Sequence, residues 1–195
     1  MQNKQGLSKR QHNISSSHQP DKLCYLFSAG YLVLVKVLLQ KCYQKKISAV
    51  YLRVDTVEQA IRSVSEQNQK IGPEGYFVLY ELTRENLQLG STVVTDSVND
   101  IILVRNTFRD IAISLNVPFL EIEIICSDKE QHRYRVENRK SDIPGLTPPD
   151  WVQVQHRDYE PWDREHLQLD TAMLSATACV DKILAITEPD KIVVR

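Results

Sequence analysis

Short apolar runs alternate with stretches of helical spacing along most of this chain. Runs rich in β-branched and aromatic residues predict strands, and each is followed by a segment with apolar positions three or four residues apart. The expected strands cover residues 48–54, 92–95, 119–125 and 167–170. The expected helices cover residues 57–67, 76–89, 101–115, 129–140, 150–158 and 176–186. This alternation is typical of α/β proteins and predicts a parallel sheet with helices on both faces.

The first residues differ from the rest. Residues 1–21 are rich in Gln, Asn, Lys, Ser and His and have no apolar period, so we expect a disordered tail. From residue 22 to 195 the pattern is that of one globular domain. With 42% hydrophobic residues overall, a domain of this length can bury a full-sized core.

Charge and cysteine usage exclude several classes of protein. The net charge of −1, from 24 basic and 25 acidic residues, argues against general nucleic-acid binding. The longest apolar stretch, residues 29–40, is too short to cross a bilayer, and no cleavage site follows it, so we expect neither a membrane span nor secretion. The four cysteines have no CxxC spacing and predict buried thiols in a reducing compartment, hence a cytoplasmic protein. They are Cys24, Cys42, Cys126 and Cys179.

Aspartates follow the predicted strands. In parallel sheets ligands bind at the carboxyl ends of the strands, where Asp55, Asp96 and Asp128 are expected to lie. These three are candidate site residues, and the alternative role is capping of the next helix. Capping is favoured for Asp128, while both interpretations stay open for Asp55 and Asp96.

Four stretches together carry a resemblance to a known family. They are YLRVDTVEQAI (51–61), GPEGYFVLYELTRENLQLGSTVVTDSVN (72–99), LEIEIICSDKEQHRYRVENR (120–139) and the segment 149–171 with PDWVQVQHRDYEPWD and HLQLDT. In order and spacing they resemble small P-loop (AAA-type) kinase-like proteins, related to zeta-toxin-like and chloramphenicol-phosphotransferase-like kinases. The resemblance implies a nucleotide-kinase-like P-loop NTPase fold with a small lid at about 129–165. It also implies ATP and Mg²⁺ as cofactors.

The phosphate-binding loop of that family is missing. A strand running into GxxxxGK(S/T) is expected, because the glycines let backbone amides surround the phosphates and the lysine neutralises them. The expected place, residues 27–37, has no glycine after Gly30, and its Val and Leu side chains would fill the phosphate space. Lys36 is the one candidate nucleotide ligand there, but a single lysine on an apolar run is usually a surface residue.

Another reading frame is compatible with the missing loop. One set of codons that encodes residues 27–46, read two bases later, translates as FCGLPGTGKSTIAKMLSKK, a complete phosphate-binding loop entering a helix. The frame can return near Gln44-Lys45-Lys46, which a run of adenines can encode. We therefore hypothesise that residues from before Phe27 to about Lys46 are out of frame, and that the tail is translated upstream sequence. The alternative is a family member whose loop has diverged.

The resemblance also assigns roles to charged residues. Asp55 would act as the general base toward a substrate hydroxyl, and Asp96 would help to hold Mg²⁺. Three arginines would form a basic lid over the phosphates: Arg133, Arg135 and Arg139. The lid role is favoured for Arg135 and Arg139, which share a helix face. The alternative for all three is a solvated face with ion pairs to nearby carboxylates: Glu130, Glu137 and Asp142.

Aromatic and basic residues also cluster near the expected lid. They are Trp151, Arg157, Tyr159, Trp162 and Arg164. They would contact base or substrate, or pack a long loop onto the domain.

Three functions fit these observations. The first is an ATP-dependent phosphotransferase acting on a small hydroxylated molecule, impaired as printed because the phosphate cradle is lost. The second is a non-catalytic remnant or pseudoenzyme from a frame-shifted gene. The third is an ATPase that works with a protein partner.

Overall fold

The computed structural model describes residues 24–28, 49–65 and 71–187, with eleven helices and strands among them. The strands are β1 (Cys24–Ser28), β2 (Ala49–Arg53), β3 (Thr92–Ser97), β4 (Phe119–Ile125) and β5 (Leu167–Asp170). The helices are α2 (Val54–Val64), α3 (Glu74–Gln88), α4 (Ile102–Ser114), α5 (Lys129–Asn138), α6 (Trp151–Gln155) and α7 (Ala176–Ile186). The predicted tail, Gly30 and Lys36 lie outside the described residues.

All five strands are parallel and form one sheet in the order β2-β3-β1-β4-β5. The four strands expected from the apolar pattern are present, and β1 is the fifth, in the centre. Its backbone pairs with β3 on one side and β4 on the other, with Phe27 opposite both Asp96 and Ile122. The carboxyl end of β1 therefore lies in the middle of the edge at which the strands end.

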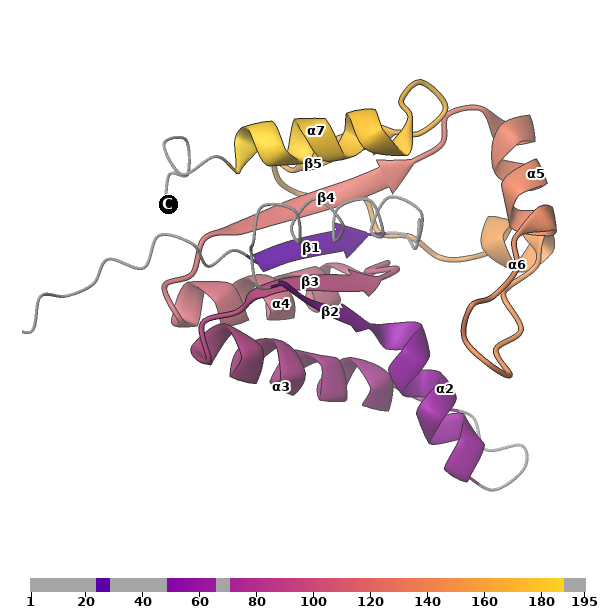
Figure 1. Ribbon diagram of the computed structural model, residues 1–195. Coiled ribbons are helices and arrows are strands. Elements are labelled where there is room, and N and C mark those ends of the chain that lie inside the picture. Colours follow the sequence, from indigo (N-terminus) through magenta and orange to yellow (C-terminus); the bar gives the residue numbers. More distant parts are fainter. Residues whose placement is uncertain (1–23, 29–48, 66–70, 188–195) are drawn as a thin grey trace, which may run out of the picture.

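Helices cover both faces of the sheet, as Figure 1 shows with α7 on one side and α3 and α4 on the other. Val93 and Val94 of β3 point to opposite faces because side chains alternate along a strand. The α7 face is packed with fully buried apolar side chains: Val94, Ile122, Leu169, Val180 and Ile183. The α3 and α4 face has its own set: Leu79, Leu87, Val93, Phe108 and Ile111. The predicted α/β architecture is confirmed.

Several boundaries differ from the expected ones. Helix α2 begins at Val54, directly after β2, so Asp55 lies in its first turn. Strand β3 continues to Ser97, which puts Asp96 inside the strand. Helix α6 ends at Gln155, earlier than expected, and Asp150 forms a capping box with Gln153 at its start.

The part of the chain between β4 and β5 forms a separate projection. Helices α5 and α6 stand beyond the carboxyl ends of the strands, at the right of Figure 1, and α2 extends from the same edge of the sheet. The expected lid, residues 129–165, includes this projection. Within the described ranges, no helix is long and apolar enough to cross a membrane.

Candidate functional site

Asp96 lies near the carboxyl end of β3, beside the central strand β1. It is 2% exposed and lies opposite Phe27 of β1 and Arg53 of β2 in the strand register. Residues 29–48 follow directly after β1 in the sequence, and they include the place where the resemblance expects a phosphate-binding loop. The strand-end argument therefore places a carboxylate beside the entry to that segment.

Two residues of β2 contact this carboxylate. Tyr51 Oη donates a hydrogen bond of 2.5 Å to Asp96 Oδ2, and Arg53 Nε lies 3.9 Å from the same oxygen. Burial raises the pKa of Asp96, and the hydrogen bond from Tyr51 and the charge of Arg53 only partly oppose that effect. Burial and the Asp96 charge together raise the pKa of Tyr51, so the phenol stays a hydrogen-bond donor. Asp96 is thus a buried carboxylate that its surroundings do not fully stabilise.

The Arg53 guanidinium lies among three carboxylates that come from three parts of the chain. Its Nη1 is 2.8 Å from Asp142 Oδ1, in the loop after α5, and its Nη2 is 3.5 Å from Asp55 Oδ2 in α2. The third carboxylate is Asp96. Arg53 therefore ties the lid loop and α2 to the end of the sheet. The Asp55 side chain is 45% exposed and remains accessible to a substrate.

The three predicted lid arginines have different partners. Arg133 forms an exposed ion pair of 2.9 Å with Glu137, one turn along the same helix. Arg135 instead reaches the loop after β5, donating to Thr171 Oγ1 at 2.9 Å and to its carbonyl at 3.1 Å. Arg139 follows α5 and donates to the carbonyl of Pro149 at 2.9 Å. The structure does not bring the three together over one point.

The residues at this site fit a Mg²⁺ ion that takes most of its ligands from water and phosphate. Mg²⁺ usually takes one or two protein carboxylates and completes its shell with water and substrate phosphate oxygens. Asp96 offers one such carboxylate, with Oδ2 already accepting from Tyr51. No group of three His, Cys, Asp or Glu residues that could hold a metal occurs among the residues described. The site therefore suits a cation that arrives with a phosphate ligand, not one caged by protein.

The segment that returns from the lid to β5 is attached to β4 by side-chain contacts. Tyr159 donates to Glu123 of β4 at 2.8 Å, and Trp162 donates to Tyr159 at 3.0 Å. Trp162 also stacks on His166 with ring centroids 4.1 Å apart. Arg164 binds both carboxylate oxygens of the buried Glu121. These side chains pack the returning segment against β4, which is the packing role considered above.

Comparisons with known proteins point to one fold. No family model and no curated protein matches the sequence. Among solved structures, the Mycobacterium tuberculosis APS kinase CysC in complex with AMPPNP and APS superposes with a TM-score of 0.63 at 15% identity, covering 86% of this chain and 98% of that one. The Chaetomium thermophilum Kti12 in complex with ADP-AlF3 gives 0.58 at 20% identity, covering 85% and 98%. A gluconokinase from Sinorhizobium meliloti gives 0.56 at 15% identity, covering 86% and 91%. The chain has the fold of the P-loop kinases.

Two residues of this P-loop kinase fold were missed in the sequence, Tyr51 and Arg53. They are two residues apart on β2 and so share one strand face, but only the pairing of β2 with β3 shows that this face is also that of Asp96. One weak sign in the sequence pointed to Arg53: it lies with Asp55 at the end of the predicted strand 48–54. The structure also shows that Asp128 accepts from the backbone N–H of Gln131, so the favoured capping role is confirmed.

Proposed function

We propose that this chain is the body of an ATP-binding phosphotransferase that acts on a small hydroxylated molecule, and that its printed sequence has lost the phosphate-binding loop. The observation that carries the proposal is the register of β1. Phe27 lies opposite Asp96, so a loop following β1 would begin beside a buried carboxylate suited to a phosphate-bound cation.

The remaining residues supply the parts of such a reaction. Asp55 is accessible and would take the proton from the acceptor hydroxyl. As the proton leaves, the acceptor oxygen would bond to the γ-phosphorus, and the bond between that phosphorus and the bridging oxygen of ADP would break. Asp96 would hold Mg²⁺, which supplies charge neutralisation at the phosphates. Arg135 and Arg139, on either side of the lid, would contribute positive charge, and Arg133 would contribute at longer range.

The printed chain itself is expected to bind nucleotide poorly. Its glycines and lysine at the loop are reduced to Gly30 and Lys36, and a phosphate cradle depends on successive free backbone amides. The free cysteines among the described residues, Cys126 and Cys179, support a reducing compartment, and we place the protein in the cytoplasm.

The test compares the printed chain with a restored chain in which residues 27–46 are replaced by FCGLPGTGKSTIAKMLSKK. We expect the restored chain to bind ATP in the presence of Mg²⁺ with at least a hundredfold higher affinity by calorimetry. Asp96→Asn in the restored chain should reduce the Mg²⁺ dependence of that binding. A restored chain that is folded but binds ATP no better than the printed one would refute the proposal.

Sequencing the underlying DNA distinguishes the two main candidates. A second frame that encodes GxxxxGKST would identify an enzyme with a disrupted or misread loop. An uninterrupted printed frame, with a loop that encodes no such motif, would instead favour a non-catalytic remnant that keeps the fold. ATP hydrolysis by the restored chain without any acceptor would favour an ATPase that works with a protein partner.

A further inference from the structure

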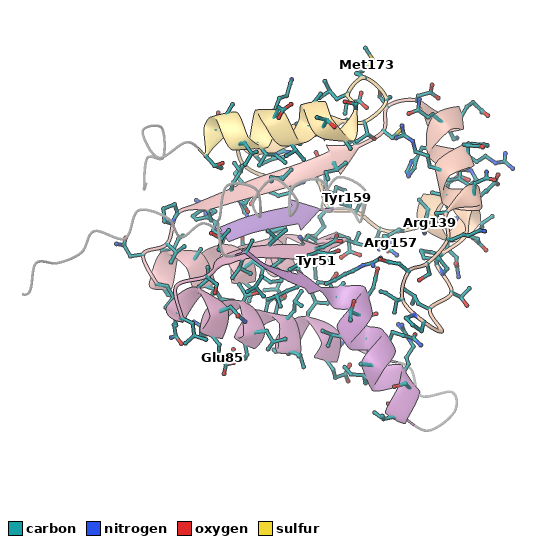
Figure 2. All side chains as sticks on the ribbon, in the orientation of Figure 1. Tyr51, Glu85, Arg139, Arg157, Tyr159 and Met173 are labelled. Carbon is teal, nitrogen blue, oxygen red and sulfur yellow. The ribbon has the colours of Figure 1, made fainter. Side chains whose placement is uncertain are left out.

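Arg139 and Arg157 lie on the side of the site nearest α2. Figure 2 shows both labelled side chains between the lid helices and the ends of the strands. The pKa of Arg139 is lowered by partial burial and by the charges of Arg157 and Arg53, and Asp55 opposes the effect. Arg139 therefore lies within electrostatic range of Arg157, Arg53 and Asp55. Arg135, bonded to Thr171, belongs to the opposite side of the lid.

The two arginines have unused hydrogen-bonding capacity. A guanidinium presents several N–H donors in a planar fork that matches a carboxylate, phosphate or sulfate. Within the described residues, Arg139 makes one side-chain hydrogen bond, to Pro149, and Arg157 is exposed and forms no ion pair. Arg53, by contrast, is already surrounded by its three carboxylates.

The loop that carries this side of the site is held against α2. Arg53 binds Asp142 at 2.8 Å near the start of the loop. Further along, Gly145 has a φ of +78°, and a Cβ at that position would lie 2.9 Å from Nε2 of Gln59 in α2. A Cβ at 145 would displace the end of the Gln59 side chain, so the loop passes close to α2 at this point. The Arg53–Asp142 ion pair and this close approach place the loop, with Arg139 at its start, near the accessible Asp55.

We propose that Arg139 and Arg157 bind an anionic group of the acceptor, a carboxylate, phosphate or sulfate, while Asp55 faces the acceptor hydroxyl. The inference rests on the proposed function and adds the substrate class to it. With a neutral acceptor, Asp55 would be the carboxylate that opposes the repulsion between the two guanidinium groups, whereas an anion would also accept from their unused donors and reduce that repulsion further. Arg157 thus becomes a specificity residue.

The printed chain is well suited to the test because it has no glycine-rich loop to bind anions. Inorganic phosphate, sulfate, D-gluconate and the matched neutral polyol D-glucitol are titrated into it by calorimetry at constant ionic strength. We expect the three anions to bind and D-glucitol not to bind. Arg139→Met and Arg157→Met should each weaken anion binding about 10- to 100-fold, since each removes charge-assisted hydrogen bonds.

Arg84→Met is the matched control, because Arg84 is equally cationic but lies on α3, where it pairs with Glu81 at 3.5 Å. Unchanged anion binding in that variant is expected. Equal losses in all three variants, or no anion binding by the printed chain, would overturn the proposal. The outcome is separate from ATP binding by the restored chain: anion binding through Arg139 and Arg157 without restored ATP binding would refute only the proposed function. Arg139→Met and Arg157→Met variants that weaken ATP but not D-gluconate in the restored chain would assign both arginines to the nucleotide instead.

Discussion

Arg105 of α4 joins two loops that lie behind the candidate site. Its side chain is 2% exposed, and its guanidinium donates to backbone carbonyls of Asn99 at 2.9 Å and Asp100 at 3.1 Å. On the other side it donates to the carbonyls of Pro161 at 3.3 Å and of Glu160. The first pair follows β3 and Asp96, and the second belongs to the segment returning from the lid. Arg105→Met keeps an apolar stem of similar length and removes every donor.

The size of the effect follows from these contacts. Hydrogen bonds from a charged donor contribute about 1.5–3 kcal/mol each, and a carbonyl left buried without a partner costs about 1–3 kcal/mol. The guanidinium also lies 4.6 Å from the Trp162 ring centroid, a cation–π contact of about 0.5–2 kcal/mol. Loss of the arginine's own desolvation cost offsets part of this sum. We expect Arg105→Met to lower the free energy of unfolding by about 3–5 kcal/mol.

Urea denaturation of the printed chain, followed by tryptophan fluorescence, measures this change. Arg109→Met, on the same helix, is the control, because Arg109 is 37% exposed and lies 3.6 Å from Glu121. That variant should lose no more than about 1 kcal/mol. If Arg105→Met lost less than about 1 kcal/mol, or no more than Arg109→Met, the idea that Arg105 clamps the two loops together would be wrong.

Two further predictions concern carboxylates whose pKa values shift in opposite directions. Burial raises the pKa of Asp96, so the folded chain binds the proton more tightly than the unfolded chain, and the charged form lowers stability above the raised pKa. Asp96→Asn should therefore raise the free energy of unfolding at pH 7, and its advantage should shrink as the pH falls toward 3.8; a destabilised variant at pH 7 would contradict this. Hydrogen bonds from Ser127 and from the backbone N–H of Ala172 lower the pKa of Asp170, so its contribution is present above 3.8 and lost as the pH falls through the folded-state pKa. Asp170→Asn should lower the free energy of unfolding at pH 7 and have little effect on it in acid. Urea titrations at pH 7 and in acid would show this difference.

The apolar pattern predicted four of the five strands because each is flanked by turn residues and a helix of clear period. Strand β1 was expected only through the family resemblance. Its printed residues continue into an apolar run, Tyr31 to Leu39, in which strand and helix cannot be told apart by period. What places β1 is its pairing with β3 and β4, which depends on tertiary contacts.

The arginine prediction shows where periodicity stops being informative. Residues 135 and 139 would share a face if the helix continued through both. Helix α5 ends at Asn138, and Arg139 has an extended backbone with φ −72° and ψ 142°, so the four-residue rule no longer applies to it. One arginine consequently points to Thr171 and the other to the loop near α2. The next helix-breaking residues in the sequence are Pro144 and Gly145, which lie several positions beyond the end of α5. The sequence therefore does not locate the end of that helix.

Asp96 also bears on the proposal that the phosphate-binding loop has been lost. In the printed chain it is a buried carboxylate whose net environment disfavours its charge, and an apolar or amide residue there would suit the fold better. Proteins retain such unfavourable residues where a ligand or a reaction needs them, because selection for activity opposes selection for stability. A body that had long been without its phosphate loop would have no such reason to keep Asp96 together with Tyr51 and Arg53 around it. A stabilising Asp96→Asn substitution, combined with an intact GxxxxGKST in the neighbouring frame, would therefore favour a recent slip or misread base over an old divergence of the loop.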